Sequence, residues 1–195
     1  INGLESGEIY YARIRSFNES GQSLNSNIIQ FLTIPRAPTS LLVENINQES
    51  AILRWDAAKG ADFYLFEFSE SPDFVNTTVE QLTSRFRVLS ELEPGVRYYV
   101  RVQSQNNSGS SGEFNNHDSL SFITIPVTPD EIIFTDYSQS GVTANWNTVS
   151  GATGYQVDVS DNGFQTFING YNNREVADPS VQIEGLSPGI AYEIR

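Results

Sequence analysis

Short segments in which apolar and polar residues alternate recur along the chain, and clusters of Gly, Pro, Asn and Ser separate them. Residues 51–56, for example, place Ala51, Leu53 and Trp55 on one face of an extended chain. A period of two is typical of a β-strand that buries one of its faces. Runs of this kind predict seven strands within residues 36–126, at 40–46, 51–56, 63–69, 74–78, 86–89, 97–104 and 119–125.

The same order of segments appears again on both sides of this region. Residues 127–195 contain six further runs and residues 1–35 contain two, and no segment shows a convincing helical period. The pattern therefore predicts an all-β chain. The additional strands are expected at 8–16, 27–33, 131–136, 142–147, 154–160, 164–171, 181–183 and 191–195.

Two residue patterns repeat together with these strands. The motif Leu-x-Pro-Gly-x-x-Tyr ends at Tyr98 and again at Tyr192, and a variant with serine in place of proline ends at Tyr10. A second set lies 91 residues from its counterpart: Trp55, Gly60, Tyr64 and Ser69 correspond to Trp146, Gly151, Tyr155 and Ser160. Self-similarity at a fixed period decides the architecture of a chain, and this period is that of a small all-β domain.

These motifs, together with the Asn-x-x-Gly-x-Ser turns that start at Asn18 and Asn106, resemble those of fibronectin type III domains. The resemblance implies tandem immunoglobulin-like β-sandwiches of seven strands in a linear array. Strands one, two and five would form one sheet, and strands three, four, six and seven the other. It divides the chain into residues 1–35, the last two strands of a domain, residues 36–126, a complete domain, and residues 127–195, a domain truncated in its sixth strand.

The motif residues are also the expected structural core. Tryptophan and tyrosine offer the largest apolar surfaces in each repeat, and a buried aromatic side chain removes on the order of 200 Å² from water. We expect each motif tyrosine to pack its ring inside and to turn its hydroxyl back to the main chain near the motif leucine. The predicted core residues are Trp55, Tyr64, Leu92 and Tyr98 in one repeat, and Trp146, Tyr155, Leu186 and Tyr192 in the next.

Short proline-containing linkers join the repeats, at residues 33–38 and 124–129. Two prolines three residues apart favour an extended, stiff connection, which predicts a rod whose modules contact their neighbours in the chain. The two ends of the chain fall at equivalent places of the repeat, so each terminal module is cut. This indicates either a window onto a longer array or strand exchange, in which residues 8–35 of one copy complete the last module of another. Lateral or head-to-tail self-association is therefore also possible.

The composition restricts the partners and the compartment. The net charge is −13, and Lys59 is the single lysine, which argues against a nucleic-acid partner and against an anionic membrane surface. The chain has no cysteine and no run of 18 apolar residues, so we expect no disulfide and no membrane insertion. The family resemblance favours an extracellular location, at a cell surface or secreted.

Catalytic chemistry has little support in the sequence, and we predict neither a catalytic residue nor a cofactor. The chain has one histidine, His117, without a nucleophile-elbow motif or an oxyanion-hole signature. Asp161-Asn162-Gly163 resembles the start of a calcium loop, but the full pattern fails and a tight turn is the simpler interpretation. We predict no metal site, with a calcium site near Asp130, Glu131 and Asp136 as the alternative.

Two surfaces are candidates for contact with other molecules. The loop at residues 105–118 contains Phe114, Asn115, Asn116 and His117, and Phe114 would either fold back on the sandwich or serve as an exposed anchor. The outward face of the sixth strand carries Tyr and Arg residues that could stack on one another. Weak glycosylation signals, Asn-x-Ser/Thr triplets, lie at Asn18, Asn76 and Asn106, and Asp118-Ser119-Leu120 resembles a bacterial O-glycan acceptor.

These observations predict a non-catalytic structural or spacer region. The Asn- and Ser-rich loops and the absence of cysteine resemble repeats of large bacterial cell-surface adhesins and filament proteins. One alternative is a module that recognises a protein or a glycan through residues 105–118. The other is an accessory region of a secreted polysaccharide-degrading enzyme.

Overall fold

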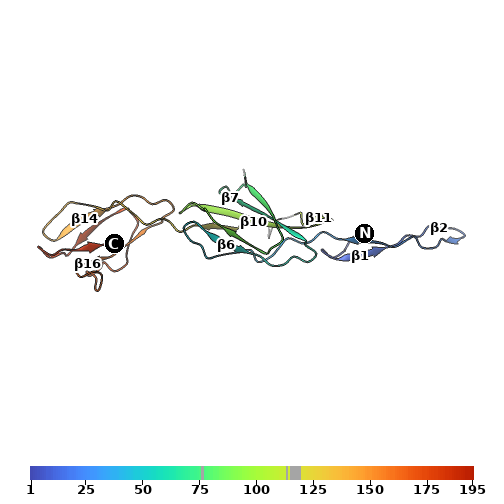
Figure 1. Ribbon diagram of the computed structural model, residues 1–195, viewed down its shortest axis with the longest axis horizontal. Coiled ribbons are helices and arrows are strands. Elements are labelled where there is room, and N and C mark those ends of the chain that lie inside the picture. The colour runs from blue at the N-terminus through green and yellow to red at the C-terminus, as the bar shows by residue number, and fades with distance from the viewer. Residues whose placement is uncertain (76, 113, 115–119) are drawn as a thin grey trace. The chain divides into compact units, whose positions relative to one another are not determined.

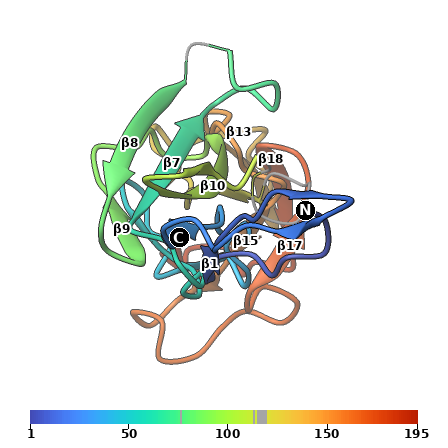
Figure 2. The ribbon, with the colours of Figure 1, turned by 90° about the vertical axis from the view of Figure 1, so that its right-hand side faces the viewer.

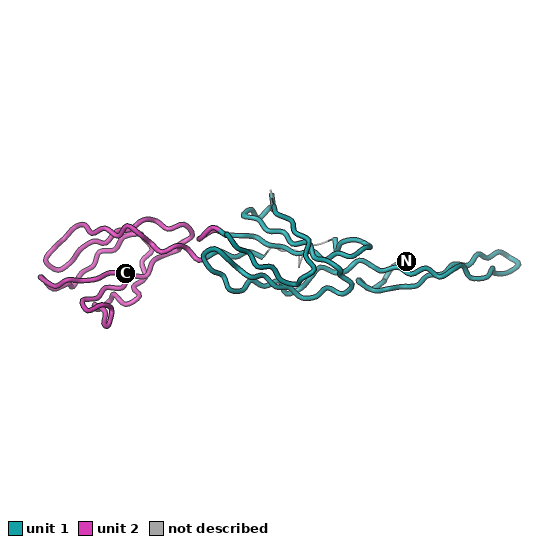
Figure 3. Tube along the Cα trace, viewed as in Figure 1, with its two compact units in different colours: residues 1–92, 97–124 teal, residues 93–96, 125–195 magenta. Residues whose placement is uncertain are grey.

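The computed structural model covers the whole chain, and the structure describes residues 1–75, 77–112, 114 and 120–195. All regular elements in these ranges are β-strands, which confirms the prediction of an all-β chain (Figure 1). The chain forms two compact units (Figure 3). Unit 1 contains residues 1–92 and 97–124, and unit 2 contains residues 93–96 and 125–195.

Unit 1 contains a sandwich of two antiparallel sheets. The first, second and fifth strands of the predicted complete domain form one sheet in the order β5 (Leu42–Glu44), β6 (Ala51–Arg54) and β9 (Phe86–Leu89). The second sheet runs from β8 (Thr78–Leu82) through β7 (Phe63–Ser69) to β10 (Arg97–Asn106), which also pairs with β11 (Gly109–Ser110) and β12 (Leu120–Ile123). Figure 2 shows β8, β7 and β10 side by side. The predicted division of strands between the sheets is confirmed.

The core of this sandwich follows from the alternation along the strands. In β10 every second residue from Tyr98 to Asn106 is buried, because successive side chains of a strand point to opposite faces. The Trp55 ring stacks on Phe66 with ring centroids 6.1 Å apart, and the Tyr98 ring contacts Phe122 at 5.8 Å. The aromatic residues therefore occupy the space between the sheets, where their large area contributes most to stability.

The N-terminal part of unit 1 is a long hairpin. Strand β1 (Ile9–Ala12) pairs with β4 (Ile29–Leu32), and the short strands β2 (Phe17–Asn18) and β3 (Gly21–Gln22) form its far end. Thr33 ties the two strands together, because its Oγ1 accepts a hydrogen bond from Glu8 N at 2.9 Å and donates one to Glu5 O at 2.7 Å. The hairpin exposes large apolar side chains along its length, among them Tyr11, Ile14, Phe17 and Leu24.

Unit 2 repeats the arrangement with shorter strands. One sheet contains β13 (Ile133–Thr135), β14 (Gly141–Asn145) and β18 (Ser180–Glu184). Opposite to it, β15 (Tyr155–Val157) pairs with β17 (Arg174–Val176), and β16 (Val159–Ser160) pairs with β19 (Glu193–Ile194). Its buried core is formed by Ala144, Val157, Val159, Tyr171, Val181 and Ile183.

The predicted strand at 154–160 is divided at Asp158 into β15 and β16, and the strand predicted at 8–16 ends at Ala12. Two further predicted strands are displaced or absent. The fourth strand of the complete domain lies at Thr78–Leu82 and not at 74–78, because Phe74 adopts a positive φ of 53° that a strand cannot contain. The segment 164–171 forms turns instead of a strand, and Phe164 has a φ of 60°. The strand that pairs with β15 is instead β17, which begins at Arg174, three residues after the end of this segment. Among the described residues, no helix has the length and hydropathy that crossing a membrane requires.

Candidate functional site: the contact between hairpin and sandwich

The predicted core residues lie inside the two units, with different degrees of burial. Trp55, Tyr64, Leu92 and Tyr98 are all buried in the sandwich. Their unit 2 counterparts Trp146, Tyr155, Leu186 and Tyr192 are partly buried. In both units the Trp and Tyr rings meet edge to face, with centroids 5.7 Å and 5.3 Å apart.

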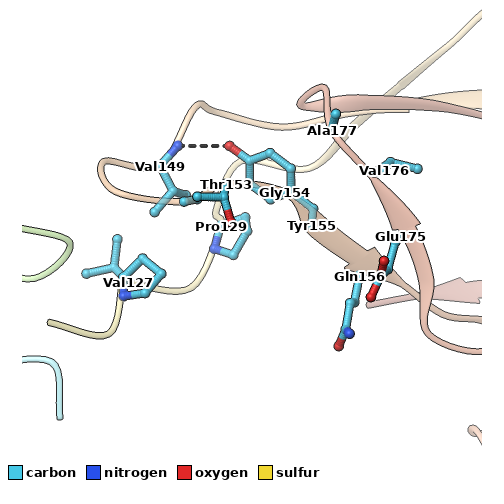
Figure 4. A pocket seen from close by; sticks show the side chains of 12 residues that line it. Val127, Pro129, Val149, Thr153, Gly154, Tyr155, Gln156, Glu175, Val176 and Ala177 are labelled. Atoms are coloured by element: carbon cyan, nitrogen blue, oxygen red, sulfur yellow. Dashed lines mark hydrogen bonds between the residues drawn. The ribbon is translucent and has the colours of Figure 1, made fainter. Parts of the chain in front are cut away.

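The third-strand tyrosines also fasten the loop that precedes them. The Tyr64 hydroxyl accepts a hydrogen bond from Ala58 N at 3.1 Å, and the Tyr155 hydroxyl accepts one from Val149 N at the same distance. Figure 4 shows the second of these bonds beside a hollow in unit 2, which Val127, Pro129 and Val176 help to line. The loop between the Trp and the Tyr is therefore held from inside the module.

The motif leucine and tyrosine form a closed corner. The Tyr10 hydroxyl accepts a hydrogen bond from Glu5 N at 2.8 Å, and the Tyr192 hydroxyl accepts one from Ser187 N at 2.9 Å. Glu5 and Ser187 both follow the leucine of the motif, so the two corners have the same geometry. The hydroxyl thus satisfies a main-chain donor in a turn that has no strand partner for it.

In unit 1 the first of these corners contacts the loop of the sandwich directly. Gly7 and Gly60 both have positive φ, 68° and 71°, and their main chains touch. A Cβ on Gly7 would lie 1.9 Å from Lys59 O, and a Cβ on Gly60 would lie 2.4 Å from the Gly7 Cα. Next to this contact Lys59 pairs with Glu8, and the hydrogen bond that Lys59 Nζ donates to the Glu8 carboxylate raises the pKa of Lys59.

Asn106 holds the same contact from the sandwich side. Its side chain is 4% exposed, and its Nδ2 donates hydrogen bonds to Thr33 O and to Gly60 O, both at 2.9 Å. Its Oδ1 accepts a hydrogen bond from Ser108 N at 2.9 Å and so closes the turn between β10 and β11. One buried amide thereby joins the linker, the glycine loop and its own turn.

The linker itself is buried at both of its prolines. Pro35 and Pro38 are both less than 2% exposed, and the Ser104 hydroxyl donates a hydrogen bond to Arg36 O between them. The prediction from the sequence was a stiff linker, based on the prolines alone. The role of Asn106 in holding this linker was missed, although its recurrence at Asn18 was a signal that could have pointed to it.

The predicted contact loop contributes Phe114 to a second cluster. The Arg101 guanidinium lies 4.0 Å from the ring centroids of both Phe74 and Phe114, and its Nε donates to Glu67 Oε2 at 2.7 Å. Phe114 is partly buried in this stack. Arg101 therefore stacks on phenylalanines and not on the tyrosine expected from its own strand. Asn115, Asn116 and His117 lie outside the described residues.

Unit 2 contains a similar cluster. The Arg195 guanidinium lies 4.4 Å from the Phe164 ring centroid, and its Nε donates to Asp158 Oδ2 at 3.0 Å. Asp158 is buried and also accepts a hydrogen bond from Asn173 N at 2.6 Å. These donors, that of Asn173 first, lower the pKa of the Asp158 carboxyl. Asp158 and Glu67 are again 91 residues apart, so the arginine–carboxylate pair belongs to the repeat.

Among the described residues, the candidate metal ligands from the sequence do not form a group. Within the described ranges no three His, Cys, Asp or Glu side chains form a group that could hold a metal ion. Asp161-Asn162-Gly163 forms a turn in which Asn162 Oδ1 accepts a hydrogen bond from Thr166 N. Asp130, Glu131 and Asp136 are exposed.

The glycosylation triplets differ in access. The amide of Asn106 is buried and bonded, whereas Asn18 is exposed. Asn76 and the Asp118-Ser119 pair lie outside the described residues.

A sandwich with strands one, two and five in one sheet, a tryptophan directly after the second strand and a tyrosine corner defines the immunoglobulin-like class of β-modules. Residues 36–117 match the family model described as fibronectin type III domain. This segment is therefore a fibronectin type III domain.

Curated relatives match over much or all of the chain. Human fibronectin type III domain-containing protein 7 is 24% identical over 196 residues, which cover the whole chain and 25% of that protein. Human tenascin-N is 24% identical over 206 residues, the whole chain and 15% of that protein. Human phosphatidylinositol phosphatase PTPRQ is 24% identical over 74% of the chain and 6% of its own length. The chain thus spans a quarter or less of these relatives.

Among solved structures, a segment of two fibronectin type III domains from chicken tenascin aligns with a TM-score of 0.46 and 21% identity. The alignment covers 80% of this chain and 87% of that one.

Proposed function

We propose that this chain is a non-catalytic, structural region of an extracellular protein, in which fibronectin type III modules act as spacers. The observation that carries the proposal is the buried amide of Asn106, which bonds the linker carbonyl of Thr33 and the loop carbonyl of Gly60. The chain uses this buried polar group to join consecutive segments rather than to line a pocket.

The physical argument concerns bending at the linker. A linker that is free on all sides would act as a hinge, since a few exposed residues can absorb large changes in φ and ψ. In unit 1 the linker is held at Thr33 O, at Arg36 O and through two buried prolines. Bending it would break these hydrogen bonds and expose the prolines, so the hairpin and the sandwich should move as one body.

The names of the relatives are consistent with this proposal at a coarse level. Tenascin-N and the receptor-type tyrosine-protein phosphatase eta are among the proteins that match over the whole chain. The finer proposal is a cell-surface adhesin or an extracellular filament, with a protein or a glycan as a possible ligand. These relatives are animal proteins and give no support to the bacterial resemblance.

The two alternatives rest on less. For recognition through residues 105–118, Phe114 would need to be a free anchor, but its ring stacks on Arg101. For an accessory region of an enzyme, the match to a phosphatase covers only 6% of that protein, so its activity is not transferred to this chain.

Pulling on single molecules tests the spacer proposal. With handles at residues 1 and 195, the chain should extend with a resolved force peak for the complete sandwich, whose long pairing of β7 with β10 must break. Featureless extension at low force would contradict the proposal. A glycan array and a pull-down with a chain lacking residues 107–118 separate spacer from recognition, because a spacer should lose no binding.

A further inference from the structure

Close contacts between main chains at glycine pairs occur in both units. In unit 1, Gly7 of the first corner contacts Gly60. In unit 2, which includes residues 93–96, Gly95 of the second corner contacts Gly151, and a Cβ on Gly95 would lie 2.0 Å from Ser150 O. Each pair thus joins a glycine of a Leu-x-x-Gly corner to the glycine of a Trp-x-x-x-x-Gly loop.

The conformation of the corner does not by itself explain this contact. The third corner glycine, Gly189, has a φ of 75°, close to the 68° of Gly7 and the 69° of Gly95. No atom lies within 4 Å of the place where its Cβ would be. The turn alone therefore explains the positive φ, whereas the contact adds a second requirement, the absence of a side chain.

The loop side of the contact has the same double requirement. Gly60 and Gly151 both have a φ of 71°, and a Cβ on Gly151 would lie 2.2 Å from Gly95 O. Each loop is held by a hydrogen bond to a tyrosine hydroxyl of its own module, from Ala58 N to Tyr64 and from Val149 N to Tyr155. The loop side of the contact is therefore held by a hydrogen bond within its own module, which lowers the entropic cost of contact.

We propose that the Leu-x-x-Gly corner is a docking surface whose partner is the Trp-x-x-x-x-Gly loop of another module of this family. Gly189 is then a free copy of this surface, and its occupant is the main chain of such a loop, one that resembles residues 57–61. The inference rests on the proposed function in one respect: the partner is a module of the same family.

Alanine substitution at the three corners tests the inference in the full chain. Gly7→Ala and Gly95→Ala combine the strain of positive φ with a collision against main chain, whereas Gly189→Ala introduces the strain alone. We expect the first two to lower the urea midpoint of unfolding at least twice as much as the third. Equal shifts at the three positions would overturn the inference.

A longer chain tests the free surface at Gly189. Arg195 occupies the place of Arg13 in the repeat, so residues 14–126 of the same sequence can be joined after residue 195. In that chain Gly189 faces a second copy of Gly60, and Gly189→Ala should become as damaging as Gly7→Ala. An unchanged effect of Gly189→Ala would overturn the docking surface.

Controls separate this result from folding and from the proposed function. Gly163 has a φ of 69° and open space around it, so Gly163→Ala gives a second measure of the cost of strain alone. If Gly7→Ala or Gly95→Ala fails to fold while Gly163→Ala and Gly189→Ala fold, the collision at the contact accounts for the difference. A chain that extends without force peaks but keeps the contrast between Gly7 and Gly189 would contradict the spacer function while leaving the docking surface in place.

Discussion

Replacing Asn106 by alanine should detach the linker from the sandwich. The side chain makes three hydrogen bonds, two from Nδ2 to the carbonyls of Thr33 and Gly60 and one from Ser108 N to Oδ1. It is 4% exposed, so water cannot easily replace these partners in an unchanged structure. The substitution therefore leaves buried polar groups without partners in addition to removing the bonds.

The magnitude follows from the number of bonds. A hydrogen bond contributes about 1 kcal/mol net to stability, and three of them give about 3 kcal/mol for Asn106→Ala. The equivalent residue Asn18 is exposed and bonds Ser20 N through its Oδ1. For Asn18→Ala we expect a loss of less than about 1 kcal/mol in the free energy of unfolding, since water can solvate the freed groups.

Urea unfolding followed by tryptophan fluorescence measures both variants. Trp55 lies in unit 1 and Trp146 in unit 2, so a Trp146→Phe background restricts the signal to unit 1. The free energy of unfolding is then compared for Asn106→Ala and Asn18→Ala in this background. Similar losses for the two variants would refute the reasoning, because they differ mainly in burial and in the bonds to the linker and the loop.

Three further predictions concern the corners and the arginine clusters. Tyr192→Phe should lower the stability of unit 2 by about 1 kcal/mol in thermal melts, because the hydroxyl no longer accepts from Ser187 N; a melt identical to wild type would reject the corner. Arg101→Lys should cost about 1–2 kcal/mol in urea unfolding, through loss of the stack on two phenylalanine rings. Arg36→Lys, in an exposed pair with Glu5, should cost about 0–1 kcal/mol, and equal costs for the two variants would argue against the stack. The lowered pKa of Asp158 stabilises unit 2 above the carboxyl's unfolded pKa, and this stability is lost as the pH falls below about 4. Asp158→Asn should therefore flatten the acid limb of stability measured by Trp146 fluorescence, and an unchanged limb would count against that assignment.

Much of the fold was predictable because the apolar residues that alternate along the strands are the ones that the structure buries in the core. Strands 63–69 and 86–89 were predicted with the bounds that the structure has, since their alternation is uninterrupted. The strands predicted at 74–78 and 164–171 were wrong because Phe74 and Phe164 adopt positive φ. Aromatic residues are strand formers, and their side-chain pattern carries no sign of a left-handed main chain.

The contact site was less accessible to sequence reasoning. The motif glycines were explained by tight turns, which accounts for Gly189 but leaves out the collision that a Cβ on Gly7 would cause. The Asn106 amide bonds carbonyls 73 and 46 residues away in the chain. Periodicity cannot report such distant partners, although the recurrence of Asn and Gly at fixed positions identifies which residues to examine.

Hydrogen exchange of the native chain tests most directly whether the hairpin is docked on the sandwich. The amides of Gly7 and Thr33 are bonded to Ile34 O and Glu8 O at the end of the hairpin near Gly60, whereas those of Ser23 and Ser26 are bonded at its far end. Docking predicts that Gly7 and Thr33 exchange much more slowly than Ser23 and Ser26, because opening the near end requires the Asn106 bonds to break. Equal protection along the hairpin would contradict the account.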